Sequence, residues 1–218
     1  MILEVINMKV LLVNGSPHKE GCTYTALCEV ADTLNKEGVE TEIFWLGNKP
    51  IGGCIACKKC LELGKCVFDD AVNEFREKAY GADGFIFGSP VHYAGASGNM
   101  TAFMDRLFYS ELCGDGNKAL YMKPAAAVVA ARRAGNTSTF DQLNKYFTIQ
   151  EMPIVSSRYW NMIFGANAEQ AKQDAEGLYK MRVLGRNMAY LLKCQEAARQ
   201  AGIPVPEQEP PVHMNFIR

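Results

Sequence analysis

Four cysteines lie close together in this chain and have the chemistry of a metal centre. They follow the spacing C-x-x-C-x-x-C-x5-C, and they are Cys54, Cys57, Cys60 and Cys66. This spacing is compact enough for four thiolates to reach one centre without ligands from distant strands. Four thiolates suit either a [4Fe-4S] cluster or a zinc ion, and two C-x-x-C steps that share Cys57 favour the cluster. Free thiols or a disulfide are the simpler alternatives.

A second candidate site is the turn from Asn14 to Thr23, which reads NGSPHKEGCT between a buried strand and a helix. The free N–H groups and the positive dipole end at the start of a helix suit a phosphate. Ser16 and Thr23 can add hydroxyl donors, and His18 and Cys22 lie in the same turn. The Walker motif is absent, and a turn of this composition is by itself also compatible with a plain structural connection.

A third group of polar and aromatic residues follows another buried strand, in the sequence GSPVHYAGASG. The residues of interest are Ser89, Pro90, Val91, His92 and Tyr93. Backbone groups near Val91 and the rings of His92 and Tyr93 can hold a flat heterocycle. The simpler interpretation is that His92 and Tyr93 are solvated loop residues, and it is their place after a strand that favours a binding role.

A fourth group, Ala131, Arg132, Arg133 and Gly135, ends a further buried strand. Its two arginines can contact ligand oxygens or stabilise a reduced, anionic ring. Two arginines before a helix are more often ordinary surface charge.

Hydrophobic patterns predict the strands that position these residues. The segment 9–14 is a continuous apolar run, typical of a strand buried on both faces, whereas 39–45 alternates as a half-exposed strand does. Shorter buried runs predict three more strands. The five expected strands are 9–14, 39–45, 84–88, 125–131 and 157–164.

Helical periodicity lies between these strands. The segment 23–37 carries apolar residues at helical spacing, with Thr23 expected as its N-cap. A second helix is expected to begin near Asp70, a third pattern includes Met104, and the longest covers 169–201. Strands that alternate with helices predict a parallel sheet.

The expected fold is α/β, a three-layer doubly wound sheet of five parallel strands in the order 2-1-3-4-5. In that order the first and third strands are neighbours, so the turns that follow them flank one crevice at the carboxyl ends of the strands. We expect a single domain over residues 1–218, with a cysteine-rich loop at 47–68 and an extended C-terminal tail at 203–218.

Taken in order, these pieces resemble the NADPH-dependent FMN reductase and iron-sulfur flavoprotein branch of the flavodoxin-like superfamily. The resemblance rests on GSPHKEGCT, GSPVHYAGASGNMTAFMDR, AARRAG and RYWNMIFG. It implies non-covalent FMN, with the phosphate at the first turn and the ring beside the other two, and a [4Fe-4S] cluster on the cysteine motif. It also implies a homodimer or homotetramer with flavin sites at subunit contacts. His18 stands where many relatives carry arginine.

Composition limits the partners of the chain. Hydrophobic residues make up 48% and charged residues 22%, which is ordinary for a globular protein. The net charge of -1 provides no global positive field, so we expect no nucleic-acid partner. No apolar stretch reaches the roughly 18 residues that span a bilayer, and the first residues lack a basic region. We therefore expect a cytoplasmic protein with no membrane partner and with reduced cysteines.

Together these features predict an FMN-binding oxidoreductase. Reduced nicotinamide, NADH or NADPH, would pass a hydride to flavin N5, and the flavin would reduce a small-molecule or protein acceptor. No side-chain acid or base is required, so no catalytic residue is assigned. The main alternative is an iron-sulfur flavoprotein that carries electrons through a cluster on the four cysteines. A third is a binding module that stores flavin or holds zinc in its cysteine loop.

Overall fold

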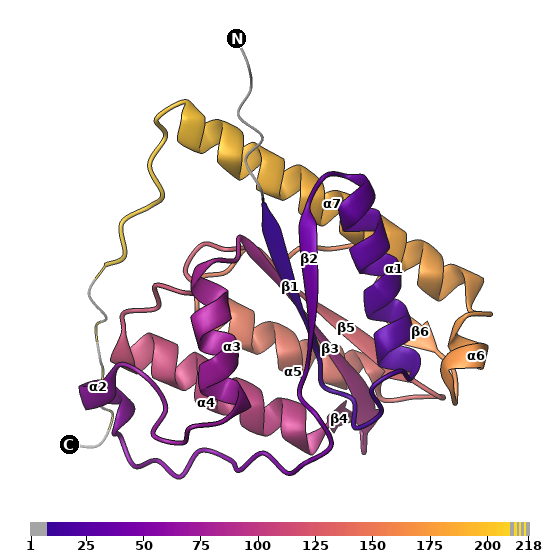
Figure 1. The fold of residues 1–218 in the computed structure, drawn as a ribbon, viewed down its shortest axis with the longest axis horizontal. Helices are drawn as coiled ribbons and strands as arrows, with labels where there is room; N and C mark the ends of the chain where they lie inside the picture. Colours follow the sequence, from indigo (N-terminus) through magenta and orange to yellow (C-terminus); the bar gives the residue numbers. More distant parts are fainter. Residues whose placement is uncertain (1–7, 210–211, 213, 215, 217–218) are drawn as a thin grey trace.

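A computed structural model describes residues 8–209, 212, 214 and 216. Its centre is a parallel sheet with strands in the spatial order β2, β1, β3, β5, β6 (Figure 1). The bounds are β1 (Lys9–Asn14), β2 (Glu40–Trp45), β3 (Gly84–His92), β5 (Ala125–Ala131) and β6 (Met162–Phe164). These five strands follow the predicted 2-1-3-4-5 order. A sixth strand, β4 (Gly95–Ala96), pairs antiparallel with β3 and was not predicted.

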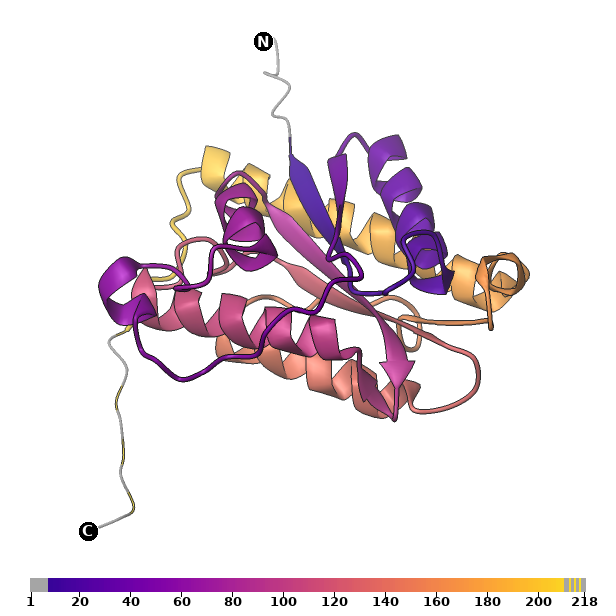
Figure 2. The same ribbon diagram turned by 60° about the horizontal axis from the view of Figure 1, so that its bottom comes forward.

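Helices cover both faces of the sheet and make three layers (Figures 1 and 2). One face is covered by α1 (Cys22–Lys36) and α7 (Ala175–Gln200). The other face is covered by α3 (Ala71–Tyr80), α4 (Gly98–Gly114) and α5 (Asn136–Ile149). Two one-turn helices, α2 (Cys60–Leu63) and α6 (Ala168–Ala171), lie at the periphery. The predicted doubly wound α/β class is therefore confirmed.

Side chains of the central strands alternate between two hydrophobic cores. Leu11 and Val13 of β1 pack with α3 and α4, whereas Val10 and Leu12 pack with α1 and α7. All four are fully buried, because successive residues of a strand point to opposite faces and both faces are covered here. The continuous apolar run at 9–14 thus predicted a central strand correctly.

The helix expected over 169–201 is in fact two helices, α6 and α7. The break lies at Asp174, whose carboxylate accepts hydrogen bonds from the backbone N–H of Gly177 at 2.9 Å and of Phe164 at 2.7 Å. Asp174 therefore caps α7 and also ties its start to the end of β6. Helical periodicity continues through the break, so it did not reveal it.

Two boundaries near the predicted sites also differ. Strand β3 continues beyond residue 88 to His92, which places Ser89 and Pro90 inside the strand. The N-cap of α1 is Gly21, not Thr23, which lies within the helix. The last strand is shorter than 157–164, because the segment before it turns: the Asn161 side chain accepts from the Ser157 N–H at 3.2 Å and donates to the Ala127 carbonyl of β5 at 2.9 Å.

The described residues after Gly202 belong to no helix or strand. Residues 210–211, 213, 215 and 217–218 of the expected tail, and 1–7 at the other end, lie outside the described residues. Within the described part of the chain, no helix is both long and apolar enough to cross a membrane.

Candidate functional site

The turns that follow β1 and β3 form one hydrogen-bonded unit. The backbone N–H of Gly15 donates to the carbonyl of Gly88 at 2.8 Å. The hydroxyl of Ser97 donates to the Gly15 carbonyl at 2.7 Å, and the Ser97 N–H donates to the hydroxyl of Ser89 at 3.0 Å. The predicted neighbourhood of these two turns is therefore present, and Ser97, which the sequence reasoning missed, joins them.

Side chains from within and beside the first turn hold its backbone. Asn14 accepts from the N–H of Ser16 at 3.1 Å and donates to the Lys19 carbonyl at 3.0 Å. The indole N–H of Trp45, at the end of β2, donates to the Ser16 carbonyl at 2.8 Å. Asn14 and Trp45 were not predicted as site residues. An asparagine that ends a buried strand before glycine was the available signal for the first of them.

The start of α1 offers hydrogen-bond donors without partners. No side chain among the described residues caps the helix, so its first N–H groups lack a capping acceptor there. The hydroxyl oxygen of Thr23 is buried and has no hydrogen-bond partner among the described residues. A Cβ on Gly21 would lie 3.3 Å from the His18 Cβ and 3.9 Å from the Ser16 hydroxyl oxygen, so a side chain would crowd this turn. These features fit a phosphate.

The remaining predicted residues of this turn face other surroundings. The thiol of Cys22 donates to the carbonyl of Gly165 at 3.3 Å, and partial burial raises the pKa of that thiol. Its side chain is thus engaged with the loop after β6. The His18 side chain is exposed, and its backbone N–H donates to the Ser16 hydroxyl at 3.2 Å.

A strained hairpin joins β3 to β4 at the second turn. His92 pairs with Gly95, and the two residues between them, Tyr93 and Ala94, have φ of +51° and +59°. Such two-residue turns suit the twist of the strands but disfavour side chains, and strain of this kind is typical of functional sites. Tyr93 is 107% exposed, so its ring projects fully from the turn. His92 is exposed as well, and Val91 is half-buried.

The third turn packs against this hairpin. Gly135 has φ of +91°, and a Cβ there would lie 2.8 Å from both Ala94 Cα and Val91 Cγ1. The Ser138 hydroxyl donates to the Ala94 carbonyl at 2.6 Å. All three predicted turns therefore meet at the carboxyl end of the sheet, and together we call them the cradle.

Polar groups at the end of β5 are free to meet a ligand. Ala131 is buried, whereas Arg132 and Arg133 are exposed and make no ion pair with the described residues. The side-chain amide nitrogen of Asn136, the first residue of α5, is buried and has no partner in the described part of the chain. Sequence reasoning missed Asn136, because an asparagine after glycine also suits an ordinary helix start.

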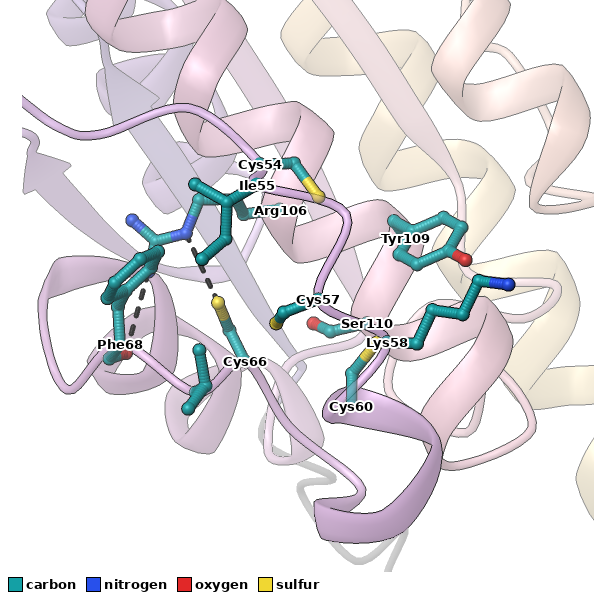
Figure 3. Close-up of a pocket in the computed structure, with 11 residues that line it drawn as sticks. Cys54, Ile55, Cys57, Lys58, Cys60, Cys66, Phe68, Arg106, Tyr109 and Ser110 are labelled. Carbon is teal, nitrogen blue, oxygen red and sulfur yellow. Dashed lines mark hydrogen bonds between the residues drawn. The ribbon is translucent and has the colours of Figure 1, made fainter.

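The four clustered cysteines line one pocket against α4 (Figure 3). Cys60 is buried, Cys66 is half-buried, and Cys54 and Cys57 are exposed. Arg106, Tyr109 and Ser110 of α4 line the same pocket, as do Phe68 and other residues of the loop. The cysteines that the sequence placed together are therefore also neighbours in space.

The backbone around Cys57 alternates between left-handed residues and a residue with negative φ. Ala56 and Lys58, on either side of it, are left-handed, with φ of +53° and +57°. Left-handed residues in alternation turn backbone N–H groups toward one side, which makes a concave site for anions, iron-sulfur centres included. Among the described residues, no three His, Cys, Asp or Glu side chains are placed to hold a single metal ion.

Amide side chains from two helices anchor the cysteine-rich loop. Asn99 of α4 donates to the Lys49 carbonyl at 2.9 Å and accepts from the Ile51 N–H at 3.1 Å. Asn73 of α3 donates to the carbonyls of Cys66 and Phe68, each at 2.9 Å. The long segment without periodicity is thus held by side chains that sequence spacing does not identify.

A fifth cysteine lies near this pocket. Burial and the nearby Cys113 raise the pKa of the Cys60 thiol. A Cβ on Gly114 would lie 2.6 Å from the Cys60 carbonyl oxygen, so α2 meets the end of α4 backbone to backbone. Sequence spacing showed no partner for Cys113, because the two cysteines approach only through this helix contact.

Helix α4 connects the cradle to the cysteine pocket. Ser97 caps its first turn in the cradle and accepts from the Met100 N–H at 3.3 Å. Arg106 to Ser110 line the cysteine pocket further along the same helix. At a rise of about 1.5 Å per residue, Ser97 and these pocket residues are roughly 13–20 Å apart along the helix axis.

A family model described as NADPH-dependent FMN reductase matches residues 8–167, which include the cradle and the cysteine pocket. The chain belongs to the NADPH-dependent FMN reductase family. Membership of this family supports an FMN-binding oxidoreductase and confirms the predicted resemblance.

Curated relatives of this family member are named iron-sulfur flavoproteins. One from Methanocaldococcus jannaschii is 35% identical over 195 residues, which cover 85% of this chain and 98% of the relative. One from Methanosarcina thermophila is 28% identical over 189 residues, which cover 85% of this chain and 96% of the relative. Both alignments extend over nearly the whole length of the relatives.

Solved structures show the same fold at low sequence identity. RosB with its bound intermediate 8-demethyl-8-formylriboflavin-5'-phosphate superposes with a TM-score of 0.69 at 16% identity, covering 97% of this chain and 94% of RosB. A WrbA-like flavodoxin from Agrobacterium tumefaciens superposes with a TM-score of 0.60 at 16% identity, covering 86% and 98% of the two chains. The family member therefore has a flavodoxin-like fold.

Proposed function

We propose that this flavoprotein transfers electrons between an FMN in the cradle and a [4Fe-4S] cluster on Cys54, Cys57, Cys60 and Cys66. The observation that carries the proposal is that all four cysteines of the motif line one pocket. The names of the curated relatives support the same function. When bound, FMN supplies exchange between two-electron and one-electron chemistry, and a cluster supplies one-electron transfer.

The cradle would hold FMN through backbone and side-chain groups of its three turns. The N–H groups at the start of α1 and the hydroxyls of Ser16 and Thr23 would bind the phosphate. The exposed ring of Tyr93, with Pro90 to His92 of β3, would border the isoalloxazine ring. Arg132, Arg133 and the amide of Asn136 would meet its polar edge.

The cysteine pocket suits a cluster better than a single zinc ion. Zinc requires four thiolates around one point, whereas each thiolate of a cubane cluster binds its own iron at a separate corner. The two C-x-x-C steps that share Cys57 favour the cluster, and among the described residues no three of these thiols are placed to hold one ion. The left-handed Ala56 and Lys58 also turn the backbone as an anionic centre requires.

A second candidate is an NADPH- or NADH-dependent reductase that passes electrons from FMN to a small-molecule or protein acceptor. The description of its family, NADPH-dependent FMN reductase, favours this function. It shares the cradle with the first proposal and differs in its electron donor and in needing no cluster.

Assembly into a homodimer or homotetramer is also part of the proposal. Tyr159 and Trp160 lie on the surface with their ring centroids 4.3 Å apart, and both are substantially exposed. Paired surface aromatics of this kind are enriched in interfaces.

Purification without oxygen tests the function directly. The visible spectrum, together with assays for FMN, iron, sulfide and zinc, should show one flavin with iron and sulfide in equal amounts. Cys57→Ser should remove iron and sulfide but keep FMN, whereas the control Cys28→Ser, a thiol outside the pocket, should keep all three. A preparation with no flavin and no iron contradicts the proposal.

Rapid mixing with NADH and NADPH then tests the second candidate. Bleaching of the flavin band by either nucleotide, in wild type and in Cys57→Ser alike, supports a nicotinamide-dependent reductase. No bleaching by either nucleotide removes that function and leaves the electron carrier.

A further inference from the structure

Arg106 is a buried charge that contacts one of the four clustered cysteines. It belongs to α4, and its side chain is only 1% exposed. Its Nε–H donates to the Sγ of Cys66 at 3.2 Å, the contact drawn in Figure 3. Cys54 and Cys57, by contrast, are exposed and show no hydrogen bond to any described side chain. In the described part of the chain, Cys66 is thus the one cysteine of the motif that accepts a hydrogen bond from a cationic side chain.

The same guanidinium also hydrogen-bonds residues on either side of the four cysteines. Its two terminal nitrogens donate to the carboxylate of Asp70 at 2.7 Å and 2.9 Å, in a bidentate pair. One of them also donates to the Gly52 carbonyl at 3.3 Å, just before the first cysteine. The guanidinium carbon lies 4.9 Å from the centre of the Phe68 ring. Residues on both sides of the cysteine motif are therefore fixed by one side chain.

We propose that Arg106 positions Cys66 as a ligand and sets the reduction potential of the cluster, with Asp70 as the opposing charge. The inference rests on the proposed function, because it requires a cluster on the four cysteines. Reduction by the flavin adds one electron, and so one negative charge, to the thiolate-bound cluster, and no bond forms or breaks. A cation and an N–H donor at a ligand sulfur stabilise the more negative form and raise the potential.

The charge pair predicts opposite effects for its two members. Arg106→Gln removes the positive charge at Cys66, so the reduced form is less stabilised and the potential falls. Asp70→Asn removes the negative charge that partly offsets Arg106, so the potential rises. The asparagine keeps an oxygen that can accept from the Val72 N–H, so α3 keeps its cap. A general loosening of the loop has no reason to shift the potential in opposite directions.

The test is a redox titration of the anaerobically purified holoprotein with dithionite, followed by electron paramagnetic resonance of the reduced cluster. The expected result is a lower midpoint potential for Arg106→Gln and a higher one for Asp70→Asn, with Arg106→Lys closer to wild type than Arg106→Gln. Arg76→Lys is the matched control for Arg106→Lys, because Arg76 is also buried and paired with a carboxylate, Glu111, but bonds no cysteine among the described residues. Its potential should equal that of wild type.

Shifts of the same sign in both variants, or none, overturn the role of Arg106 while leaving the proposed function intact. If Arg106→Gln does not fold, the midpoint potential of Asp70→Asn alone decides the proposal. A higher potential supports the proposal, and an unchanged or lower one overturns it. Wild-type protein without iron and sulfide is a different failure, because it removes the proposed function and this inference with it. Iron and sulfide assays on wild type therefore precede the titration.

Discussion

The Ser97 hydroxyl donates to the carbonyl of Gly15, a residue 82 positions earlier in the chain. Ser97→Ala should lower the free energy of unfolding by about 2 kcal/mol, because it removes the cap of α4 and leaves a buried carbonyl without a donor. Urea denaturation measures this loss, and FMN titration should show weaker binding because the two turns separate. Ser110→Ala, whose hydroxyl donates only within α4 to Leu107, is the control. Equal losses in both variants would contradict the bridging role.

Thr23→Val should separate the stability of the protein from its affinity for FMN. The buried Thr23 oxygen has no partner among the described residues, so a methyl in its place leaves the free energy of unfolding of flavin-free protein equal or higher. Affinity for FMN should fall about tenfold, or ~1.4 kcal/mol, because a phosphate contact is lost. Flavin fluorescence titration measures it. Thr33→Val, whose hydroxyl donates to the Glu29 carbonyl, should leave affinity unchanged.

Gly135→Ala tests the packing of the third turn on the hairpin. The new Cβ would meet Ala94 and Val91 at 2.8 Å, in a residue with φ of +91°. Gly38→Ala is the matched control, because Gly38 has φ of +83° with no atom within 4 Å of the added Cβ. The control should cost about 1 kcal/mol from backbone strain alone, and Gly135→Ala roughly 1–3 kcal/mol more from overpacking. If thermal or urea unfolding showed similar losses of stability in the two variants, the hairpin would move aside for the added methyl group at little cost.

Tyr93→Gly should stabilise the flavin-free protein and weaken FMN binding. Glycine relieves about 1 kcal/mol of strain at a φ of +51°, and the fully exposed ring makes no packing contribution that its removal would cost. Loss of a stacked ring should cost about 1 kcal/mol of affinity, or roughly fivefold. Ala94→Gly relieves the same strain but keeps the ring, so only stability should change. An unchanged dissociation constant in Tyr93→Gly would place the flavin away from this ring.

Glu42 should make the free energy of unfolding depend on pH. Hydrogen bonds from Lys9 and Lys78 lower the pKa of this carboxyl below its usual 4.5. Its contribution is therefore present above about pH 4.5 and is lost as the pH falls through the lower value in the folded state. The difference in unfolding free energy between wild type and Glu42→Gln should be at most about 1 kcal/mol and should shrink in acid. If the difference in unfolding free energy grew in acid instead, the pKa of Glu42 would be raised in the folded state, contrary to the prediction.

Much of the fold followed from residue patterns. The apolar run at 9–14 and the alternation at 39–45 predicted a central and an edge strand, and both are confirmed. The break at Asp174 and the short strand β4 were missed, because each depends on contacts that local periodicity does not encode. Asp174 serves two elements at once, and β4 exists only as the return arm of a two-residue turn.

The candidate site was predictable where residues adjoin strand ends. The three turns of the cradle and the four cysteines were named from position and spacing, and they do meet in the structure. Asn136 was not named, because an asparagine after glycine also suits an ordinary helix start. Ser97 and Arg106 were not named, because their importance comes from partners far along the chain. Arg106 shows this most clearly, since it contacts Cys66 from 40 residues away.

Helix α4 has a consequence for the speed of electron movement. The cradle meets its first turn and the cysteine pocket meets its middle, so both centres of a loaded protein would lie against one continuous, hydrogen-bonded helix. Tunnelling weakens steeply with separation, and thermal motion changes the length of such a helix very little. The distance between donor and acceptor along α4 is therefore set by the number of helical residues between the two sites. All four cysteines belong to the loop at 47–68, so the distance would also depend on the contacts of Asn99 and Arg106 that hold this loop to α4.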